Sequence, residues 1–154
     1  MRYWEDFWPG QVFDCGGRFV SKAEIVAFAR EFDPQPFHLD DAHPTSAMYG
    51  GLIASGWHSC CIAMRLAVDA VLRESASLGS PGMDKIRFLK PLRPDMRVSL
   101  RLTVRSTVPS QNRADRGRVE ILFELFDDEG ALLMDFVSTG IFGRRTAVPA
   151  AAGD

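Results

Sequence analysis

The sequence predicts an α+β fold in which an antiparallel sheet wraps around one long buried helix. Between residues 57 and 73 almost every position is apolar or small, and a helix that is apolar nearly all round is expected to be buried. Residues 97–105 alternate between apolar and polar side chains, which is typical of a strand with one face on a core. The 154 residues are enough for one domain with its own hydrophobic core.

The N-terminal part of the chain predicts a strand followed by a short helix. Residues 11–20 have the composition of a strand, and Gly16-Gly17 within them indicates a bend or bulge. Ser21 and Glu24 have the spacing of a capping box, so the helix is expected to begin directly after Ser21. The apolar face predicted for this helix consists of Ile25, Phe28, Ala29 and Phe32.

A loop is expected between the short helix and the long one. Asp33-Pro34 ends the short helix, because proline disfavours helical geometry in the residue before it. Residues 39–43 are expected to form one helical turn, and Gly50-Gly51 is a flexible break. Ser55 then has the character of an N-cap for the long helix.

The last part of the chain predicts four strands. Their expected ranges are 83–92, 97–105, 118–126 and 131–143. The segment 127–130 ends in glycine and predicts a tight turn, and 109–117 is expected to be a long hairpin tip. We therefore expect an antiparallel meander within a single domain of residues 1–145, followed by a disordered tail at 146–154.

Composition excludes several classes of function. Hydrophobic residues make up 46% and charged residues 25%, which is ordinary for a soluble globular protein, and the net charge of −2 argues against binding nucleic acid through a basic field. The sequence contains no run of about 18 apolar residues, so no membrane span is predicted. The acidic, aromatic start lacks a signal-peptide core, so a cytoplasmic location is expected. Cys15, Cys60 and Cys61 are expected to be reduced, and no Cys/His spacing predicts zinc.

The segment Asp33-Pro34-Gln35-Pro36-Phe37-His38 is the strongest candidate for chemistry. It places a carboxylate and an imidazole five residues apart on a backbone that two prolines stiffen. A carboxylate beside an imidazole can fix its orientation and tautomer, and such a preorganised pair suits general acid–base catalysis. The alternative is that Asp33 ends a helix or forms an Asx turn while His38 caps a helix.

Gly56 is the candidate oxyanion donor. It lies where the long helix begins, and unpaired N–H groups and the helix dipole favour negative charge there. Glycine serves close packing equally well, so that interpretation stays open. His43, in a polar loop, is expected to face solvent, and His58 is expected to be a core histidine rather than a site residue.

These segments together resemble the MaoC-like dehydratase family, whose best-known members are (R)-specific enoyl-CoA hydratases. The hexapeptide 33–38 resembles the family's Asp-x-Asn-Pro-(aliphatic)-His signature, 50–58 resembles its entry into the central helix, and 88–95 resembles the strand and turn that follow. Gln35 and Phe37 depart from the signature, and Met64 stands where these hydratases carry a serine, unless Ser59 or Cys60 replaces it.

The resemblance implies a hot-dog fold and reversible hydration of a trans-2-enoyl-CoA to an (R)-3-hydroxyacyl-CoA. Asp33 and His38 would activate the water, Gly56 would bind the carbonyl oxygen, and no metal or redox cofactor would be needed. A homodimer or higher homo-oligomer is implied, with the acyl-thioester tunnel at its interface, and no nucleic-acid or membrane partner. The candidate substrate-binding residues are Gln35, Phe37, Ser55, Trp57, Lys85, Arg87 and Lys90.

Three points stay open at the level of sequence. The basic residues at 85, 87, 90 and 93 could anchor the phosphates of coenzyme A or simply form a solvated strand face. The reaction could instead be thioester hydrolysis, because thioesterases of this fold use a carboxylate to direct water. The chain could also be a catalytically impaired subunit that binds an acyl thioester beside an active partner.

Overall fold

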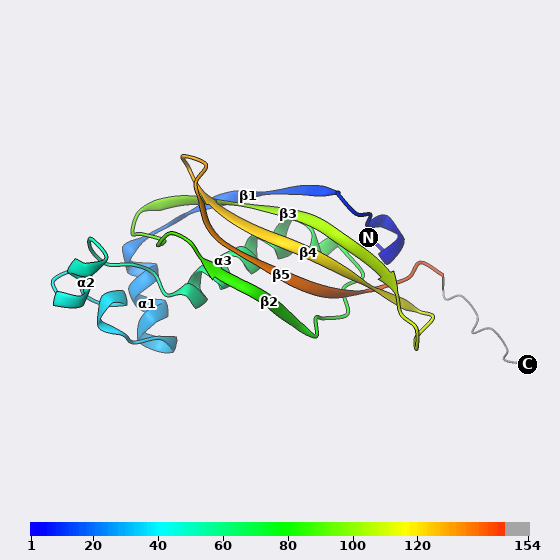
Figure 1. Cartoon of the computed structure of the whole chain (residues 1–154), viewed down its shortest axis with the longest axis horizontal. Helices are drawn as coiled ribbons and strands as arrows, with labels where there is room; N and C mark the ends of the chain where they lie inside the picture. Colours follow the sequence, from blue (N-terminus) through cyan, green and yellow to red (C-terminus); the bar gives the residue numbers. More distant parts are fainter. Residues whose placement is uncertain (147–154) are drawn as a thin grey trace, which may run out of the picture.

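The computed structural model describes residues 1–146, so the expected tail lies outside the described residues except for Thr146. Five strands form one antiparallel sheet in the order β1-β3-β4-β5-β2, and α3 packs against it (Figure 1). No helix within the described part of the chain is long and apolar enough to cross a membrane. The elements are η1 (Trp4–Asp6), β1 (Val12–Val20), α1 (Lys22–Phe32), η2 (Pro36–His38), α2 (Pro44–Met48), α3 (Gly56–Ala70), η3 (Leu72–Glu74), β2 (Gly82–Phe88), β3 (Met96–Pro109), β4 (Arg116–Asp127) and β5 (Leu132–Gly143).

The alternating pattern on β3 correctly predicts which face meets the core. Val98, Leu100, Leu102 and Val104, the apolar positions of the predicted pattern, are at most 2% exposed. Leu100, Leu102 and Val104 lie opposite buried residues of β4. The bulge predicted in β1 is also confirmed, because the register shifts between Asp14 and Gly17. A Cβ atom at Gly17 would lie 2.3 Å from the carbonyl oxygen of Val98, so this close approach of two strands requires glycine.

The expected four-stranded meander is wrong in one respect. β3, β4 and β5 do follow one another in the sheet, but β2 pairs with β5 rather than with β3. The reason is that β1 already occupies the free edge of β3. The helical segment between β1 and β2 carries the chain across to the opposite edge, where β5 offers the remaining partner.

The long helix is shorter and less completely buried than predicted. α3 ends at Ala70, and the 3₁₀ turn η3 replaces its expected last turn. One face, including Ile62, Ala63 and Leu66, packs into the core, whereas Trp57 is 59% exposed. The sheet covers only one side of the helix, and the outer side carries a ladder of ion pairs: Arg65–Asp69–Arg73.

The beginning of α1 matches the sequence prediction only in part. The Ser21 side chain accepts a hydrogen bond from the Glu24 N–H at 3.2 Å, as expected for a cap. The Glu24 carboxylate, however, does not complete a capping box, because it pairs with Arg18 at 2.6 Å. Phe32 is 65% exposed and does not belong to the buried face, since the helix ends there and the chain turns away.

The turn expected at residues 39–43 is also wrong. The helical turns lie on either side of it, in η2 and α2, and each begins with a proline. Proline suits the first helical position because its fixed φ matches and its missing N–H needs no acceptor there. α1 and α2 lie together beyond one end of the sheet, where α3 begins (Figure 1). This arrangement brings the proline-rich loop 33–38 to the first turn of α3.

Candidate active site

The structure brings the predicted acid and base together. The Nε2 atom of His38 lies 3.3 Å from Oδ2 of Asp33, and the two side chains are 6% and 18% exposed. Pro34 and Pro36 separate them, so the backbone leaves α1 in an extended geometry and re-enters a single 3₁₀ turn at His38. The loop is held against the start of α3, because the N–H of Ile53 donates to the Phe37 carbonyl at 3.1 Å.

The hydrogen bonds of His38 determine which ring nitrogen is free to react. Nδ1 lies 2.7 Å from the carbonyl oxygen of Ile53. A carbonyl oxygen only accepts, so Nδ1 carries the hydrogen and the neutral ring has its lone pair on Nε2. Nε2 faces Oδ2 of Asp33 and the pocket, so it is the ring nitrogen that can exchange a proton there.

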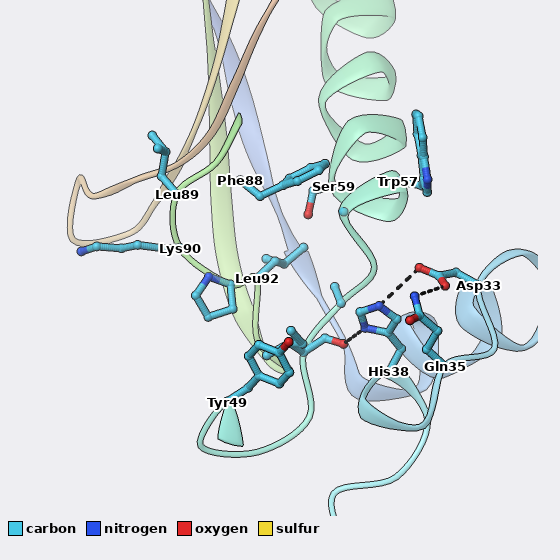
Figure 2. A pocket seen from close by; sticks show the side chains of 14 residues that line it. Asp33, Gln35, His38, Tyr49, Trp57, Ser59, Phe88, Leu89, Lys90 and Leu92 are labelled. Atoms are coloured by element: carbon cyan, nitrogen blue, oxygen red, sulfur yellow. Dashed lines mark hydrogen bonds and ion pairs between the residues drawn. The ribbon is translucent and has the colours of Figure 1, made fainter. Parts of the chain in front are cut away.

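Asp33 is the most heavily hydrogen-bonded side chain of the site. Ser55 Oγ donates to its Oδ2 at 2.6 Å. Gln35 Nε2 donates to its Oδ1 at 2.7 Å (Figure 2). The bond from Ser55 is the main cause that lowers the pKa of Asp33, and the Gln35 bond and the charge of His38 act in the same direction. Partial burial acts to raise the pKa of Asp33, but the net shift is downward. Asp33 is therefore kept ionised beside the imidazole.

The first residues of α3 supply a backbone donor to the same site. Ser55 caps the helix, its Oγ accepting from the Trp57 N–H at 3.2 Å. The N–H of Gly56 has no hydrogen-bond acceptor within the described residues. A Cβ atom at Gly56 would lie 2.5 Å from the ring of Phe88. Both open interpretations of Gly56 thus have a basis, since it offers a free N–H and also admits a close packing contact.

A pocket of about 410 Å³ opens beside these groups (Figure 2). His38, Asp33 and Gly56 share it with apolar side chains that include Tyr49 directly after α2, Phe88 at the end of β2, and residues of the loop after β2. An apolar wall with a few convergent polar groups is the usual character of a small-molecule site. The lining residues are Asp33, Gln35, His38, Tyr49, Ile53, Ala54, Gly56, Trp57, Ser59, Phe88, Leu89, Lys90, Pro91 and Leu92.

Four of the predicted substrate-binding residues lie outside this lining. Ser55 is behind it, fully buried and bonded to Asp33, and Phe37 packs its ring against His38 with centroids 4.4 Å apart. Arg87 is engaged with Asp135, its Nε donating at 2.8 Å. Lys85 is exposed on β2, whereas Lys90 does line the pocket.

The other two histidines take structural places, which was expected for His58, whereas His43 does not simply face solvent as predicted. His43 is half-buried and caps α2, its Nδ1 accepting from the Thr45 N–H at 3.2 Å. His58 is buried in α3, stacked on Phe28 with centroids 4.6 Å apart, and its Nε2 lies 3.5 Å from Glu24. No group of three or more His, Cys, Asp or Glu side chains among residues 1–146 is arranged to hold a metal ion.

Sequence reasoning missed several residues of the pocket wall, notably Tyr49, Leu89 and Leu92, and left Ser59 only as a substitute for Met64. Met64 does not line the pocket and is 37% exposed, whereas Ser59 is buried and directed into it (Figure 2). The spacing of Gly56 and Ser59 carries a usable signal, because residues three apart share one face of a helix. Leu89 and Leu92 reach the site only because β2 pairs with β5.

Comparison with known proteins identifies the family. The model of the MaoC like domain matches residues 7–121, which include the loop 33–38, all of α3 and the pocket wall after β2. The chain belongs to the MaoC-like dehydratase family. The resemblance drawn from the three sequence segments is thus confirmed.

Individual relatives support this assignment. The uncharacterized protein YdeM of Bacillus subtilis is 29% identical over 125 residues, covering 81% of this chain and 87% of its own. The crystal structure of a MaoC-like dehydratase from Rhodospirillum rubrum is 34% identical with a TM-score of 0.88, covering 95% of this chain and 99% of that one. The R-hydratase PhaJ1 of Pseudomonas aeruginosa shares the fold at 20% identity, with a TM-score of 0.74 and coverage of 99% and 93%. The predicted hot-dog fold is confirmed.

Proposed function

We propose that this MaoC-like protein is a hydro-lyase that hydrates a trans-2-enoyl-CoA to an (R)-3-hydroxyacyl-CoA. The observation that carries the proposal is the convergence of three groups on one pocket: the Nε2 lone pair of His38, the ionised Asp33 and the free N–H of Gly56. The reaction needs a base for water, a proton source for C2 and a donor for the carbonyl oxygen. His38 meets the first two needs in turn, as base and then as acid, Asp33 helps it to hold the water, and the Gly56 N–H meets the third.

The proposed step balances its protons within the pair. A water held between His38 and Asp33 attacks C3 while Nε2 of His38 takes one of its protons. Electron density moves from the C2–C3 double bond to the thioester oxygen, where the Gly56 N–H stabilises the negative charge. The imidazolium of His38 then returns the proton to C2. Because one pair supplies both parts of water, we expect them to add to the same face.

Lys90 is the proposed anchor for an anionic part of the substrate. It is the cationic side chain in the pocket lining, and coenzyme A carries phosphates that such a cation can bind. Arg87 is a weaker candidate because its guanidinium is already paired with Asp135. Lys85 lies on the exposed strand β2 and could contact a more distant part of coenzyme A.

A direct test follows the loss of enoyl absorbance with crotonyl-CoA and longer enoyl-CoA substrates. We expect turnover by the wild type and a fall of about 10²- to 10⁴-fold in kcat for Asp33→Asn and His38→Ala, the usual contribution of a general acid–base group. Asp115→Asn, at the exposed hairpin between β3 and β4, is the matched control and keeps full activity.

Two results would replace the proposal with an alternative. Release of free thiol from a saturated acyl-CoA, without enoyl hydration, would assign a thioesterase. Tight binding of enoyl-CoA without turnover would assign a binding subunit that needs an active partner.

A further inference from the structure

The Ser55 hydroxyl occupies an unusual position between a helix and a catalytic side chain. It is fully buried, it donates to Asp33 Oδ2 at 2.6 Å, and it accepts from the Trp57 N–H at 3.2 Å. An N–H only donates and an ionised carboxylate only accepts. The hydrogen of the hydroxyl is therefore directed at Asp33, and the capping bond fixes that direction.

This bond reaches the same oxygen that faces the imidazole. Oδ2 of Asp33 lies 2.6 Å from Ser55 Oγ and 3.3 Å from His38 Nε2, whereas Gln35 binds Oδ1. Gln35 is only two residues away from Asp33, so its bond orders the loop internally. Ser55 is 22 residues away and directly precedes Gly56, so its bond joins the loop to the helix.

His38 is tied to the same short segment. Its Nδ1 bonds the carbonyl of Ile53, two residues before Ser55. The segment 53–56 therefore fixes all three groups of the site. Ile53 holds the imidazole, Ser55 holds the carboxylate, and Gly56 supplies the backbone N–H. A shift of about 1 Å between such groups can cost a factor of about 100 in rate.

We propose that Ser55 is a positioning residue for hydration, which holds the Asp33 carboxylate in register with both His38 and the Gly56 N–H. This inference rests on the proposed function of the pocket. Ser55 does not line the pocket, so it acts through Asp33 and not on the substrate. Its bond is also the main cause of the lowered pKa of Asp33, so its loss should raise that pKa.

The experiment compares Ser55→Ala and Ser55→Gly with the wild type in crotonyl-CoA hydration. Glycine is the second variant because it replaces serine at a helix N-cap with a loss of only a few tenths of a kcal/mol. We expect kcat to fall about 10- to 100-fold in both variants, as for a misplaced catalytic group, with a smaller change in KM. A fall in kcat without a matching change in KM is the readout that a general loss of stability would not produce.

A double-mutant cycle separates positioning from a general loss of stability. If Ser55 acts through Asp33, adding Ser55→Ala to Asp33→Asn should change kcat by less than about twofold, because the effects of substituting two residues in contact do not add. Ser21→Ala is the matched control, because Ser21 caps α1 in the same way and contacts no residue of the pocket lining. It should lower the melting temperature and leave kcat unchanged.

The outcomes are distinguishable from failure of the proposed function. An active wild type whose Ser55 variants keep kcat, or whose double variant loses activity additively, overturns the role of Ser55 alone. A wild type that hydrates no enoyl thioester overturns both proposals.

Discussion

His38 and His58 show how their surroundings give two histidines different properties. His38 lines the pocket, with its tautomer fixed by Ile53 and its Nε2 available to the substrate. His58 is buried against Phe28, and its Nδ1 has no hydrogen-bond partner within the described residues. Burial lowers the pKa of His58, although Glu24 partly opposes this effect. His58 is therefore kept neutral in the folded protein.

This burial predicts a loss of stability in mild acid. Because the folded pKa of His58 lies below the unfolded value of about 6.5, the unfolded chain binds more protons below that pH. The contribution of neutral His58 to the free energy of unfolding is complete above the pKa of the unfolded chain. It declines as the pH falls toward the pKa of His58 in the folded protein. The melting temperature of the wild type should therefore decrease between about pH 7 and pH 5 more steeply than that of His58→Phe. Equal slopes for the two proteins would contradict this assignment.

The three cysteines also differ in how deeply they are buried. Burial raises the pKa of Cys15 and of Cys60 to about 11, whereas Cys61 is exposed on α3. Since the thiolate is the nucleophile, a thiol reagent should modify one cysteine rapidly in the native protein and all three after unfolding. Cys61→Ser should remove the rapid phase. Fast modification in that variant would show that Cys15 or Cys60 is accessible.

At the level of elements, the start of α3 depends on its contact with β2. Gly56 has no side chain, and the ring of Phe88 fills the space that a Cβ atom would take. Ser55 caps the helix and Gly56 begins it, so two neighbouring residues connect α3 to the loop 33–38 and to the edge strand β2. The same contact forms part of the pocket wall.

Gly56→Ala tests this contact. Alanine favours a helix over glycine by about 1 kcal/mol, but overpacking against Phe88 should cost about 1–3 kcal/mol. We expect a lower melting temperature and reduced hydration in the single variant. In a Phe88→Ala background the same substitution should be neutral or stabilising. Destabilisation of equal size in both backgrounds would show that Phe88 is not the cause.

Local chemistry explains which elements the sequence could predict. The cap at Ser21, the turn before β5 and the alternating face of β3 follow from short-range rules, and the structure confirms them. The Asp33–His38 pair was predictable because both members lie in one stiff hexapeptide. Tyr49 and Leu92 were not, because only the tertiary fold brings them to the pocket. The exposed stripe on α3 was missed because periodicity does not show how much of a helix a sheet will cover.

At the scale of the whole molecule, the sheet of residues 1–146 has two outer strands, β1 and β2, each with one free edge. β2 pairs only with β5 within the described residues, and Met83 and Phe88 on β2 are 38% and 56% exposed. An open edge with apolar side chains favours pairing with another chain. We propose that the homodimer implied by the family resemblance forms here, with the edges of two β2 strands meeting.

Sedimentation equilibrium tests the dimer. The wild type should have twice the mass of one chain, and Met83→Glu should shift it toward the monomer by placing charge at the edge. Val108→Glu, on β3 near the hairpin tip, is the control with a similarly exposed apolar residue and should stay dimeric. A monomeric wild type, or equal dissociation of both variants, would contradict pairing through β2.

The most direct test of the catalytic account is the stereochemistry of hydration in heavy water. Crotonyl-CoA is converted by the wild type in D₂O, and the configurations at C2 and C3 of the product are determined. Because His38 and Asp33 lie on one side of the pocket, the account predicts (R)-3-hydroxybutyryl-CoA with deuterium and hydroxyl added to the same face. Addition to opposite faces would require a second acid elsewhere in the pocket and would contradict the assignment of both proton transfers to this pair.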